Sequence, residues 1–277
     1  MLIYKSRFLT RGEVWFDDER DGTPVDWIYF RQRSTPVAQS RWKYFDTLLF
    51  DLAKSPAQLR SEMSERTLQK IEEAESKDQA RWECCEARES KRMDEIETLW
   101  NQFAAATKSP RLDRDWLDKT SEAGALVLSA VRDAEGNVLT YHLSYAGKTR
   151  AQDLIVVSPH NLVPNSALRK RINRANCFGH WKNMVTFKER GLRYYDFGGW
   201  YGGTTDMRLL GMNAFKKGFG GKVVREYHCE QILTLKGWLV LNAARVLKRA
   251  KFLPSVSEPS AADSPAAVRD LAAAASG

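Results

Sequence analysis

The sequence predicts a mixed α/β domain, and three observations support this fold class. Hydrophobic periodicity changes along the chain from strand-like alternation to helical spacing and back. Clusters of Gly, Pro, Asp and Asn separate the periodic segments, as they do at turns. The composition, with 43% hydrophobic residues and nine tryptophans, is typical of a chain with a buried core. This order of elements predicts a sheet flanked by helices.

The N-terminal part is predicted to be β-structure. Residues 12–17 and 25–33 have β-rich patterns, and the charged turn sequence DDERDGTP separates them. This pattern predicts an N-terminal hairpin within residues 1–44. The segment FDTLLFDL that follows is more continuously apolar, which favours a buried strand at the start of a main domain over residues 45–252.

Two helices with a short strand between them are predicted next. The sequence SPAQ at 55–58 has the form of a capping box, so we expect a long charged helix to about Lys77, with a solvated face. A strand at 82–85 leads to a helix over 93–107. The apolar residues of that helix have helical spacing and are interpreted as core and not as a cofactor-binding stripe: Ile96, Leu99, Trp100 and Phe103.

The middle of the chain predicts an antiparallel meander followed by a long helix. β-rich segments at 125–132, 138–145 and 153–157 are joined by short turns. Residues 166–190 have a helical pattern throughout. We expect Gly191 to end this helix, because glycine readily adopts the left-handed conformation.

The stretch from Asp196 to Gly221 carries the most specific signal. It opens with a YDFGG strand that ends in Gly198 and Gly199. Two residues without side chains permit unusual backbone angles or the close approach of a ligand. The sequence therefore indicates an opening at the end of this strand.

A short helix and a further strand are predicted after that opening. Residues 207–215 have a helical pattern, and Lys216 and Lys217 lie in the last turn, where cations suit the helix dipole. Phe219 lies between glycines and is expected to be a buried plug before a strand at 222–227. A turn-rich crossover without functional role explains these features as well as a site does.

The C-terminal residues predict an amphipathic helix and a tail. Residues 231–251 read as the end of a strand and a helix, and residues 253–277, rich in Ala, Ser and Pro, are expected to be disordered. No signal peptide or apolar transmembrane segment is recognised, so we expect a cytoplasmic protein. The helix at 237–251 either packs on the sheet or contacts an anionic membrane surface peripherally.

The net charge indicates which partners are expected, and the cysteine spacing indicates whether a metal site or disulfides are expected. The net charge of +8 indicates an anionic partner, such as a phosphate-bearing cofactor, a nucleic acid or a lipid headgroup, or else a basic surface without one. The four cysteines have neither metal-ligand spacing nor a disulfide pattern. No metal site is therefore expected.

Two sequence strings carry a resemblance to a known family. The run INRANCFGHWKNMVTFKERGLRYYDFGG, followed by NAFKKGFGG, resembles Fem-type (FemAB-like) aminoacyl transferases and the GNAT-like acyltransferases grouped with them. The resemblance is specific over about 165–228 and looser over 45–160. It implies a single-domain GNAT-like fold with a central, mostly antiparallel sheet flanked by helices.

The same resemblance implies an enzyme and its substrates. Family members transfer an acyl or aminoacyl group from acyl-CoA or aminoacyl-tRNA, without a covalent enzyme intermediate or a prosthetic group. The acceptor is expected to be an amine or hydroxyl of a small metabolite, a polysaccharide or a cell-envelope precursor. Fem ligases that build peptidoglycan bridges have two such domains, whereas this chain has room for one, so a bridge-forming role is not expected.

By resemblance, Phe215 and Lys216 match the family's Phe-Lys pair, which places the lysine near the acyl donor and the developing negative charge. Asp196 is expected to orient an amine or to cap the next turn. Further residues of the two strings are assigned to substrate binding, namely Asp196, Gly198, Gly199, Trp200, Tyr201, Lys217 and Phe219.

The donor phosphate has a candidate site at the start of the long helix. The glycine-containing loop of acetyl-CoA-dependent enzymes is replaced here by NSALRKRINRAN. Its cations are expected either to bind phosphate with the helix N-terminus or to form a basic helix edge: Arg169, Lys170, Arg171 and Arg174.

Two histidines are further candidate site residues, and a non-catalytic function is the alternative to an enzyme. His142 is a candidate general base or a packed strand residue. His180 is expected to face the acceptor groove or the core, with the core favoured. The alternative to an enzyme is a non-catalytic module on the same scaffold whose cations bind anions or RNA. No oligomeric state is predicted.

Overall fold

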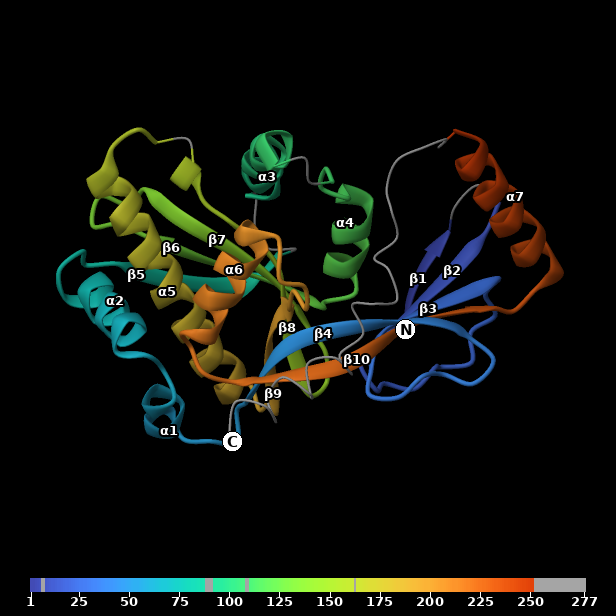
Figure 1. The fold of residues 1–277 in the computed structure, drawn as a ribbon, viewed down its shortest axis with the longest axis horizontal. Helices are drawn as coiled ribbons and strands as arrows, with labels where there is room; N and C mark the ends of the chain where they lie inside the picture. Colours follow the sequence, from blue (N-terminus) through green and yellow to red (C-terminus); the bar gives the residue numbers. More distant parts are fainter. Residues whose placement is uncertain (6–7, 88–91, 108–109, 162, 252–277) are drawn as a thin grey trace.

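The computed structural model describes residues 1–5, 8–87, 92–107, 110–161 and 163–251. The described residues form one ten-stranded sheet with helices packed against it (Figure 1). The strands are β1 (Leu2–Lys5), β2 (Thr10–Trp15), β3 (Trp27–Arg33), β4 (Arg41–Asp51), β5 (Arg81–Glu86), β6 (Leu126–Arg132), β7 (Val138–Ala146), β8 (Arg150–Val157), β9 (Tyr194–Gly199) and β10 (Lys222–Ile232). The helices are α1 (Pro56–Ser61), α2 (Glu65–Ser76), α3 (Met93–Thr107), α4 (Arg114–Glu122), α5 (Ser166–Glu189), α6 (Met207–Lys217) and α7 (Leu235–Lys251). The predicted tail, residues 253–277, lies outside the described residues.

The sheet is mostly antiparallel, as predicted. Its strand order is β1-β2-β3-β10-β4-β9-β8-β7-β6-β5. Among the described strands, only the neighbours β2–β3 and β8–β9 run parallel. The predicted meander is confirmed as β6, β7 and β8.

The predicted N-terminal hairpin is wrong in its pairing. Strand β2 lies parallel to β3, with Arg11 opposite Trp27, and its antiparallel partner is β1. The antiparallel neighbour of β3 is β10, which comes from the other end of the chain. Local sequence patterns identify strands but not partners distant in sequence, and this explains the error.

The predicted helix from 56 to 77 is two helices. The capping box at Ser55 and Gln58 is confirmed at the start of α1. The break follows because Ser64 caps α2 by accepting a hydrogen bond from the Thr67 backbone, while its own N–H donates to Gly218. Helix α4 was not predicted; it begins at the capping residue Asp113.

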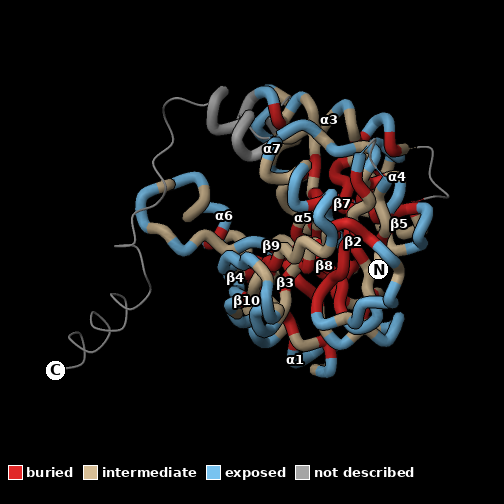
Figure 2. The backbone as a smooth tube through the Cα atoms, turned by 90° about the vertical axis from the view of Figure 1, so that its right-hand side faces the viewer, coloured by how far each residue is buried: buried red, intermediate tan, exposed pale blue. Residues whose placement is uncertain are grey.

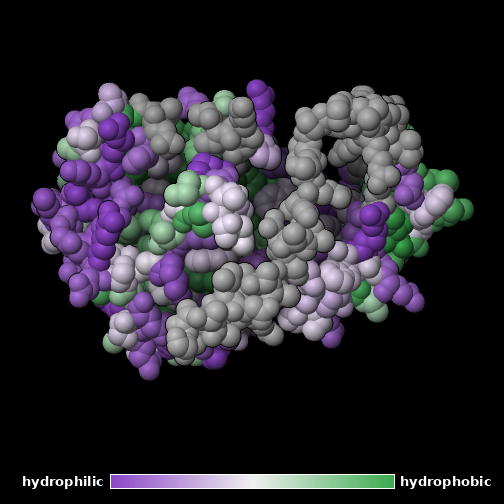
Figure 3. All heavy atoms as spheres, viewed as in Figure 1, coloured by the Kyte–Doolittle hydropathy of each residue, from purple (hydrophilic) through white to green (hydrophobic). Residues whose placement is uncertain are grey.

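Hydrophobic cores cover both faces of the sheet. Helices α1, α2 and α5 share one core with Val127 and Val131 of β6, and helices α3 and α4 share the other with Leu128 and Ala130. Strand β6 is buried on both sides because successive residues point to opposite faces. Figure 2 shows buried segments gathered around β2, β7 and β8. The surface over α2 is strongly hydrophilic, as predicted for its solvated face (Figure 3).

The parallel strands β8 and β9 diverge in the middle of the sheet. They pair from Arg150 opposite Tyr194 to Gln152 opposite Asp196, and no further. Beyond that point the remaining residues of both strands line a cavity. The predicted opening after the YDFGG strand is therefore the separation of two parallel strands.

A β-bulge lies at this opening. Thr47 of β4 is opposite Gly199 whereas Leu49 is opposite Asp196, so β9 carries an extra residue between these two pairs. Gly198 in the bulge has a φ of 70°. A Cβ atom at Gly198 would lie 3.3 Å from the carbonyl oxygen of Asp153. The positive φ would also strain the backbone of any residue with a side chain. Glycine is required there on both counts.

Candidate functional site

The main cavity has a volume of about 1010 Å³ and lies where β8 and β9 separate. One end is formed by the bulge of β9, the last turn of α6 and the middle of α5. The other end is formed by residues of β2, β3, α3 and α4. The sequence strings that resemble Fem-type transferases thus contribute one end of the cavity.

Lys216 lies at the first end of the cavity. Its Nζ donates hydrogen bonds to the carbonyl oxygens of Gly199 (2.7 Å) and Gly198 (3.2 Å). No carboxylate of the described residues forms an ion pair with it. Burial lowers the pKa of Lys216, while the charges of Asp196 and Asp153 act in the opposite direction. An ammonium group has three donors, so one remains after these two bonds.

Aromatic side chains surround this end. Phe215 lines the cavity beside Lys216, and Phe219 is buried, with 1% of its surface exposed, as predicted for a plug. The ring of Phe219 packs 5.0 Å from that of Phe197 and 5.4 Å from that of Phe215. All three rings also contact the imidazole of His180. The cation is therefore held in a largely apolar wall.

Asp196 belongs to a buried charge network and does not line the cavity. Its carboxylate forms an ion pair with Arg150, whose guanidinium also binds Glu226, with an Nη1 to Oε1 distance of 2.6 Å. Gln32 donates to the carboxylates of both Asp196 (2.7 Å) and Glu226 (3.2 Å). The Gly198 N–H donates to Oδ1 of Asp196 at 2.7 Å. Of the two roles considered for Asp196, this bond supports the capping of the bulge.

Burial has opposite effects on the two ends of this network. It raises the pKa of Glu226, and the bonds from Arg150 offset that effect only in part. Burial also acts to lower the pKa of Arg150, but the two carboxylates outweigh it and the pKa is raised. Arg150 therefore stays charged among its partners.

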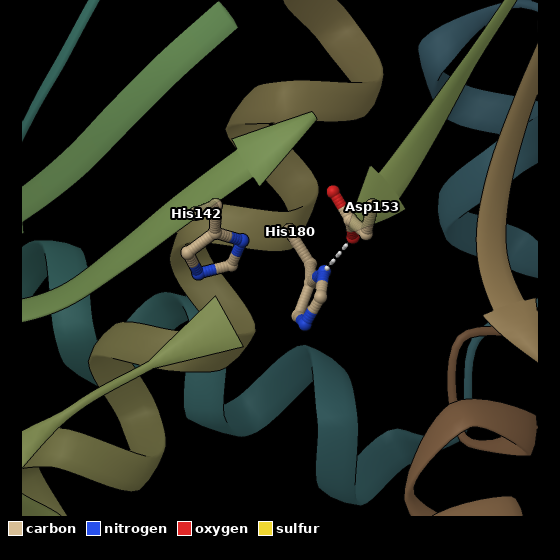
Figure 4. Close-up of side chains that lie close together, drawn as sticks. All are labelled: His142, Asp153 and His180. Carbon is tan, nitrogen blue, oxygen red and sulfur yellow. Dashed lines mark ion pairs between the residues drawn. The ribbon is translucent and has the colours of Figure 1, made fainter. Parts of the chain in front are cut away.

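His180 and Asp153 lie together on the cavity wall. Nδ1 of His180 is 3.1 Å from Oδ2 of Asp153, and the two side chains come from α5 and β8 (Figure 4). Asp153 also accepts hydrogen bonds from Ser144 (2.8 Å) and Tyr195 (2.7 Å). The expectation that favoured the core for His180 is corrected in part: the side chain is 5% exposed, but it lines the cavity.

His142 stands behind His180, 4.5 Å away between ring centroids. It is fully buried, and its Nδ1 is 3.2 Å from the side-chain amide of Asn183. Burial, together with the neighbouring His180, lowers the pKa of His142 to about 3, so it is neutral. It is not among the cavity-lining residues. Its role as a general base stays a prediction, while His180 occupies the position on the wall.

The far end of the cavity is aromatic. Trp15, Trp116 and Arg31 are all bound there to the buried carboxylate of Glu13, at 2.8, 3.1 and 2.8 Å. Neither indole N–H is therefore free for a ligand. Trp100 and Phe103, which were predicted to be core, line the cavity, whereas Ile96 of the same helix is fully buried as predicted.

The other predicted substrate-binding residues lie at different places. Gly198 and Gly199 line the cavity, but Trp200, Tyr201 and Lys217 do not. The backbone of Tyr201 is bound to the side chain of Asn213 at both its N–H (3.1 Å) and its carbonyl (2.7 Å), which ties the loop to α6. Binding roles for these three residues stay predictions.

A second, cationic cavity of about 560 Å³ lies between α2 and α5. Arg169, Lys170 and Arg174 line it, as does Lys70 of α2, which the sequence did not suggest. Arg174 is largely engaged with Asp78, to which it donates two hydrogen bonds. The fourth predicted cation points elsewhere: Arg171 approaches Asp133 and Glu135 and does not line this cavity.

The two cavities share a wall, formed by His160 and Asn173. Asn173 starts a polar stripe along α5 that continues with Asn176, His180 and Asn183 at helical spacing. Asn183 accepts a hydrogen bond from Ser129 at 2.8 Å, beneath His142. A polar stripe on the face of a helix that otherwise packs on a sheet is the sequence signal that would have identified His180.

Comparison with solved structures fits this geometry. No protein-family model matches the chain, and no curated protein matches it in sequence. The structure of FemX matches with a TM-score of 0.54 and 15% identity over 72% of this chain and 63% of that chain. The chain has a Fem-like GNAT-type fold. It spans less than two thirds of the FemX chain, and its ten-stranded sheet is larger than that of a typical GNAT domain.

A second structure supports the same fold. It is the C-terminal domain (DUF2156) of a protein from Agrobacterium fabrum described as a lysylphosphatidylglycerol synthetase. It matches with a TM-score of 0.50 and 17% identity over 79% of this chain and 72% of that chain. At these identities the likeness concerns the fold alone.

Proposed function

We propose that the protein is an acyltransferase. It would transfer an acyl or aminoacyl group from acyl-CoA or aminoacyl-tRNA to an amine or hydroxyl of a cell-envelope, polysaccharide or metabolite acceptor. The observation that carries this proposal is the Lys216 ammonium group, which is held at the cavity wall by two neutral carbonyl oxygens and has no carboxylate partner among the described residues.

A fixed positive charge favours acyl transfer. When an acceptor attacks the acyl carbon, a negative charge develops on the carbonyl oxygen. A fixed ammonium in a site of low polarity stabilises that charge more than it stabilises the neutral donor. We propose direct attack in a ternary complex, with Lys216 as the electrostatic stabiliser and Phe215 as part of the wall beside the acyl group.

The second cavity suggests how the donor is held. Both candidate donors carry phosphate, and Arg169, Lys170 and Lys70 provide cations beside the start of α5. Because His160 and Asn173 line both cavities, we propose that one elongated molecule occupies both, with its phosphate in the second and its acyl carbon in the first. The same cations also support the alternative, a non-catalytic module that binds anions or RNA.

A candidate membrane contact lies at the start of α7. Leu235, Trp238 and Leu239 at the start of α7 are 73%, 54% and 55% exposed. No described helix is long and apolar enough to cross a membrane. We propose that these side chains insert into an anionic leaflet beside a lipid acceptor. Co-sedimentation with phosphatidylglycerol vesicles should be lost in Trp238→Ser and Leu239→Ser; unchanged sedimentation would rule this contact out.

Donor identification tests the proposed function. The purified protein is analysed by mass spectrometry for co-purifying coenzyme A thioesters or aminoacyl-tRNA and is then titrated with both. Wild type and the Lys222→Met control, which changes an exposed lysine beyond the site, should give the same product from the bound donor, and Lys216→Ala should not. Binding of RNA or phosphate without any transfer would favour the non-catalytic alternative.

A further inference from the structure

The pair formed by His180 and Asp153 has the geometry of a base and its positioning group. Nδ1 of His180 lies 3.1 Å from Oδ2 of the carboxylate, although its N–H is not aligned for a hydrogen bond, and the other ring nitrogen, Nε2, points away from Asp153 (Figure 4). None of the described residues binds Nε2 of His180, and both side chains line the main cavity. An acceptor in this cavity therefore meets an imidazole whose second nitrogen has no protein partner.

The carboxylate of Asp153 is fixed and ionised. Ser144 binds one oxygen and Tyr195 the other. Burial acts to raise the pKa of Asp153, but the contact with His180 and the bond from Tyr195 outweigh it and lower the pKa. A fixed anion beside Nδ1 favours the tautomer that carries its proton on Nδ1 and leaves the lone pair on Nε2.

The other groups around His180 do not compete for this role. His142 packs against it and is neutral, and the rings of Phe197, Phe215 and Phe219 contact it without offering a proton acceptor. Among the described residues that line the cavity, the cations are Lys216 and Arg208 of α6 and Arg31 of β3. A base and a cation thus lie on the wall of one cavity.

Resting on the proposed function, we propose that His180 is its catalytic base and that Asp153 is the positioning residue of that base. As the acceptor nitrogen or oxygen bonds to the acyl carbon, its proton moves to Nε2 of His180. The electron pair of the C=O double bond moves to the oxygen, toward Lys216. Collapse of this oxyanion breaks the bond to the thiol sulfur or ribose oxygen of the donor, and that leaving group takes the proton back from His180.

A metal centre is the competing assignment for these side chains. His142, Asp153 and His180 place one donor atom each within 4.8 Å of one another. We assign proton transfer instead because His180 and Asp153 line the cavity, whereas His142 has no position on its wall.

The tautomer can be measured without turnover. The chain has four histidines, so long-range ¹H–¹⁵N correlation spectra of the full chain, with His180→Gln for assignment, resolve each ring. We expect a protonated Nδ1 and an unprotonated Nε2 on His180, with this preference lost in Asp153→Asn. A protonated Nε2 would overturn the proposal, as would stoichiometric zinc whose removal by EDTA shifts the His180 signals.

The kinetic test uses the acyl donor that is identified in the experiment comparing wild type with Lys216→Ala. His180→Gln should lower kcat by about 10²–10⁴-fold and remove the decline of the rate at acid pH, because a base must be unprotonated to act. Lys216→Met should keep that decline. A His180→Gln variant with the wild-type rate and pH profile would overturn the assignment. If wild type transfers no acyl group at all, the proposed function fails, which the tautomer measurement distinguishes from an error about His180.

Discussion

Two cations in this protein, the buried Arg150 and the half-buried Lys216, lie near the same carboxylate, and they differ in what surrounds them. Arg150 is bound by Asp196 and Glu226, and Gln32 completes the network. Lys216 lies on the other side of the bulge and is bound by two carbonyl oxygens. Arg150 is 5% exposed and does not line the cavity, whereas Lys216 lines it.

This difference distinguishes a cation that stabilises the fold, Arg150, from a cation that is available for chemistry, Lys216. The Arg150 network compensates its charges internally, so it fixes β3, β4, β8, β9 and β10 in one register around the bulge. Lys216 forms no ion pair with a carboxylate of the described residues, although the charges of Asp196 and Asp153 act on it, and this leaves the ammonium available to a ligand that supplies negative charge. Such a group is expected where negative charge develops during a reaction.

Removing Arg150 should have the largest effect on stability. Arg150→Met leaves two buried carboxylates without their cation, so the free energy of unfolding should fall by about 3–5 kcal/mol. Urea denaturation measures this. The control is Arg193→Met, whose partner Asp51 is exposed to solvent, with an expected cost of at most about 1 kcal/mol. Equal losses in the two variants would show that the Arg150 network has no special role in stability.

Lys216 should show the opposite behaviour in the same assay. Lys216→Met replaces a desolvated cation by an apolar side chain of similar length, so the free energy of unfolding should stay the same or rise by up to about 2 kcal/mol. A loss of unfolding free energy comparable with that of Arg150→Met would mean that Lys216 is a structural cation. The two cations would then not differ in role.

The buried histidines should make the folded protein less stable at acid pH. Burial lowers the pKa of His142 to about 3 and that of His228, which also lines the cavity, to about 4. Below the unfolded pKa of about 6.5 the unfolded chain takes up protons that the folded chain does not, so stability falls as the pH falls, by up to about 1.4 kcal/mol per pH unit for each group. Between pH 6.5 and 4, His228→Gln should show a shallower decline than wild type; an equal slope would contradict this.

The cations of the second cavity should have the smallest individual effects. Lys70→Gln and Lys170→Gln each remove one phosphate contact, worth about 1 kcal/mol or about fivefold in affinity for coenzyme A. Arg171→Gln should change the affinity less, because Arg171 approaches Asp133 and Glu135 and lies outside the cavity. Calorimetric titration at two salt concentrations compares the three variants. Equal losses in all three would indicate a general effect of charge and not a phosphate site.

The sequence predicted what depends on neighbours along the chain. The capping box of α1, the meander, the end of α5 at Gly191 and the cations in the last turn of α6 are local features, and all are confirmed. The orientation of β2 and β3 was missed because two neighbouring strands predict an antiparallel hairpin, whereas the antiparallel neighbour of β3 is β10 from the other end of the chain.

The same limit applies to the site. The position of Lys216 follows from a local string, but its partners follow from the bulge that β4 imposes on β9. The contact between His180 and Asp153 joins α5 to β8 and has no local pattern at either residue. In the sequence, only the polar stripe along α5, which was not recognised there, indicates that this face of the helix borders a cavity.

We propose that the Lys216 ammonium stabilises negative charge during acyl transfer. The most direct test of this proposal is the single-turnover rate of Lys216→Met with the identified donor, measured beside the donor dissociation constant. We expect a rate about 10²–10³-fold below wild type, with donor affinity changed much less. A wild-type rate, or a loss confined to donor binding, would contradict it.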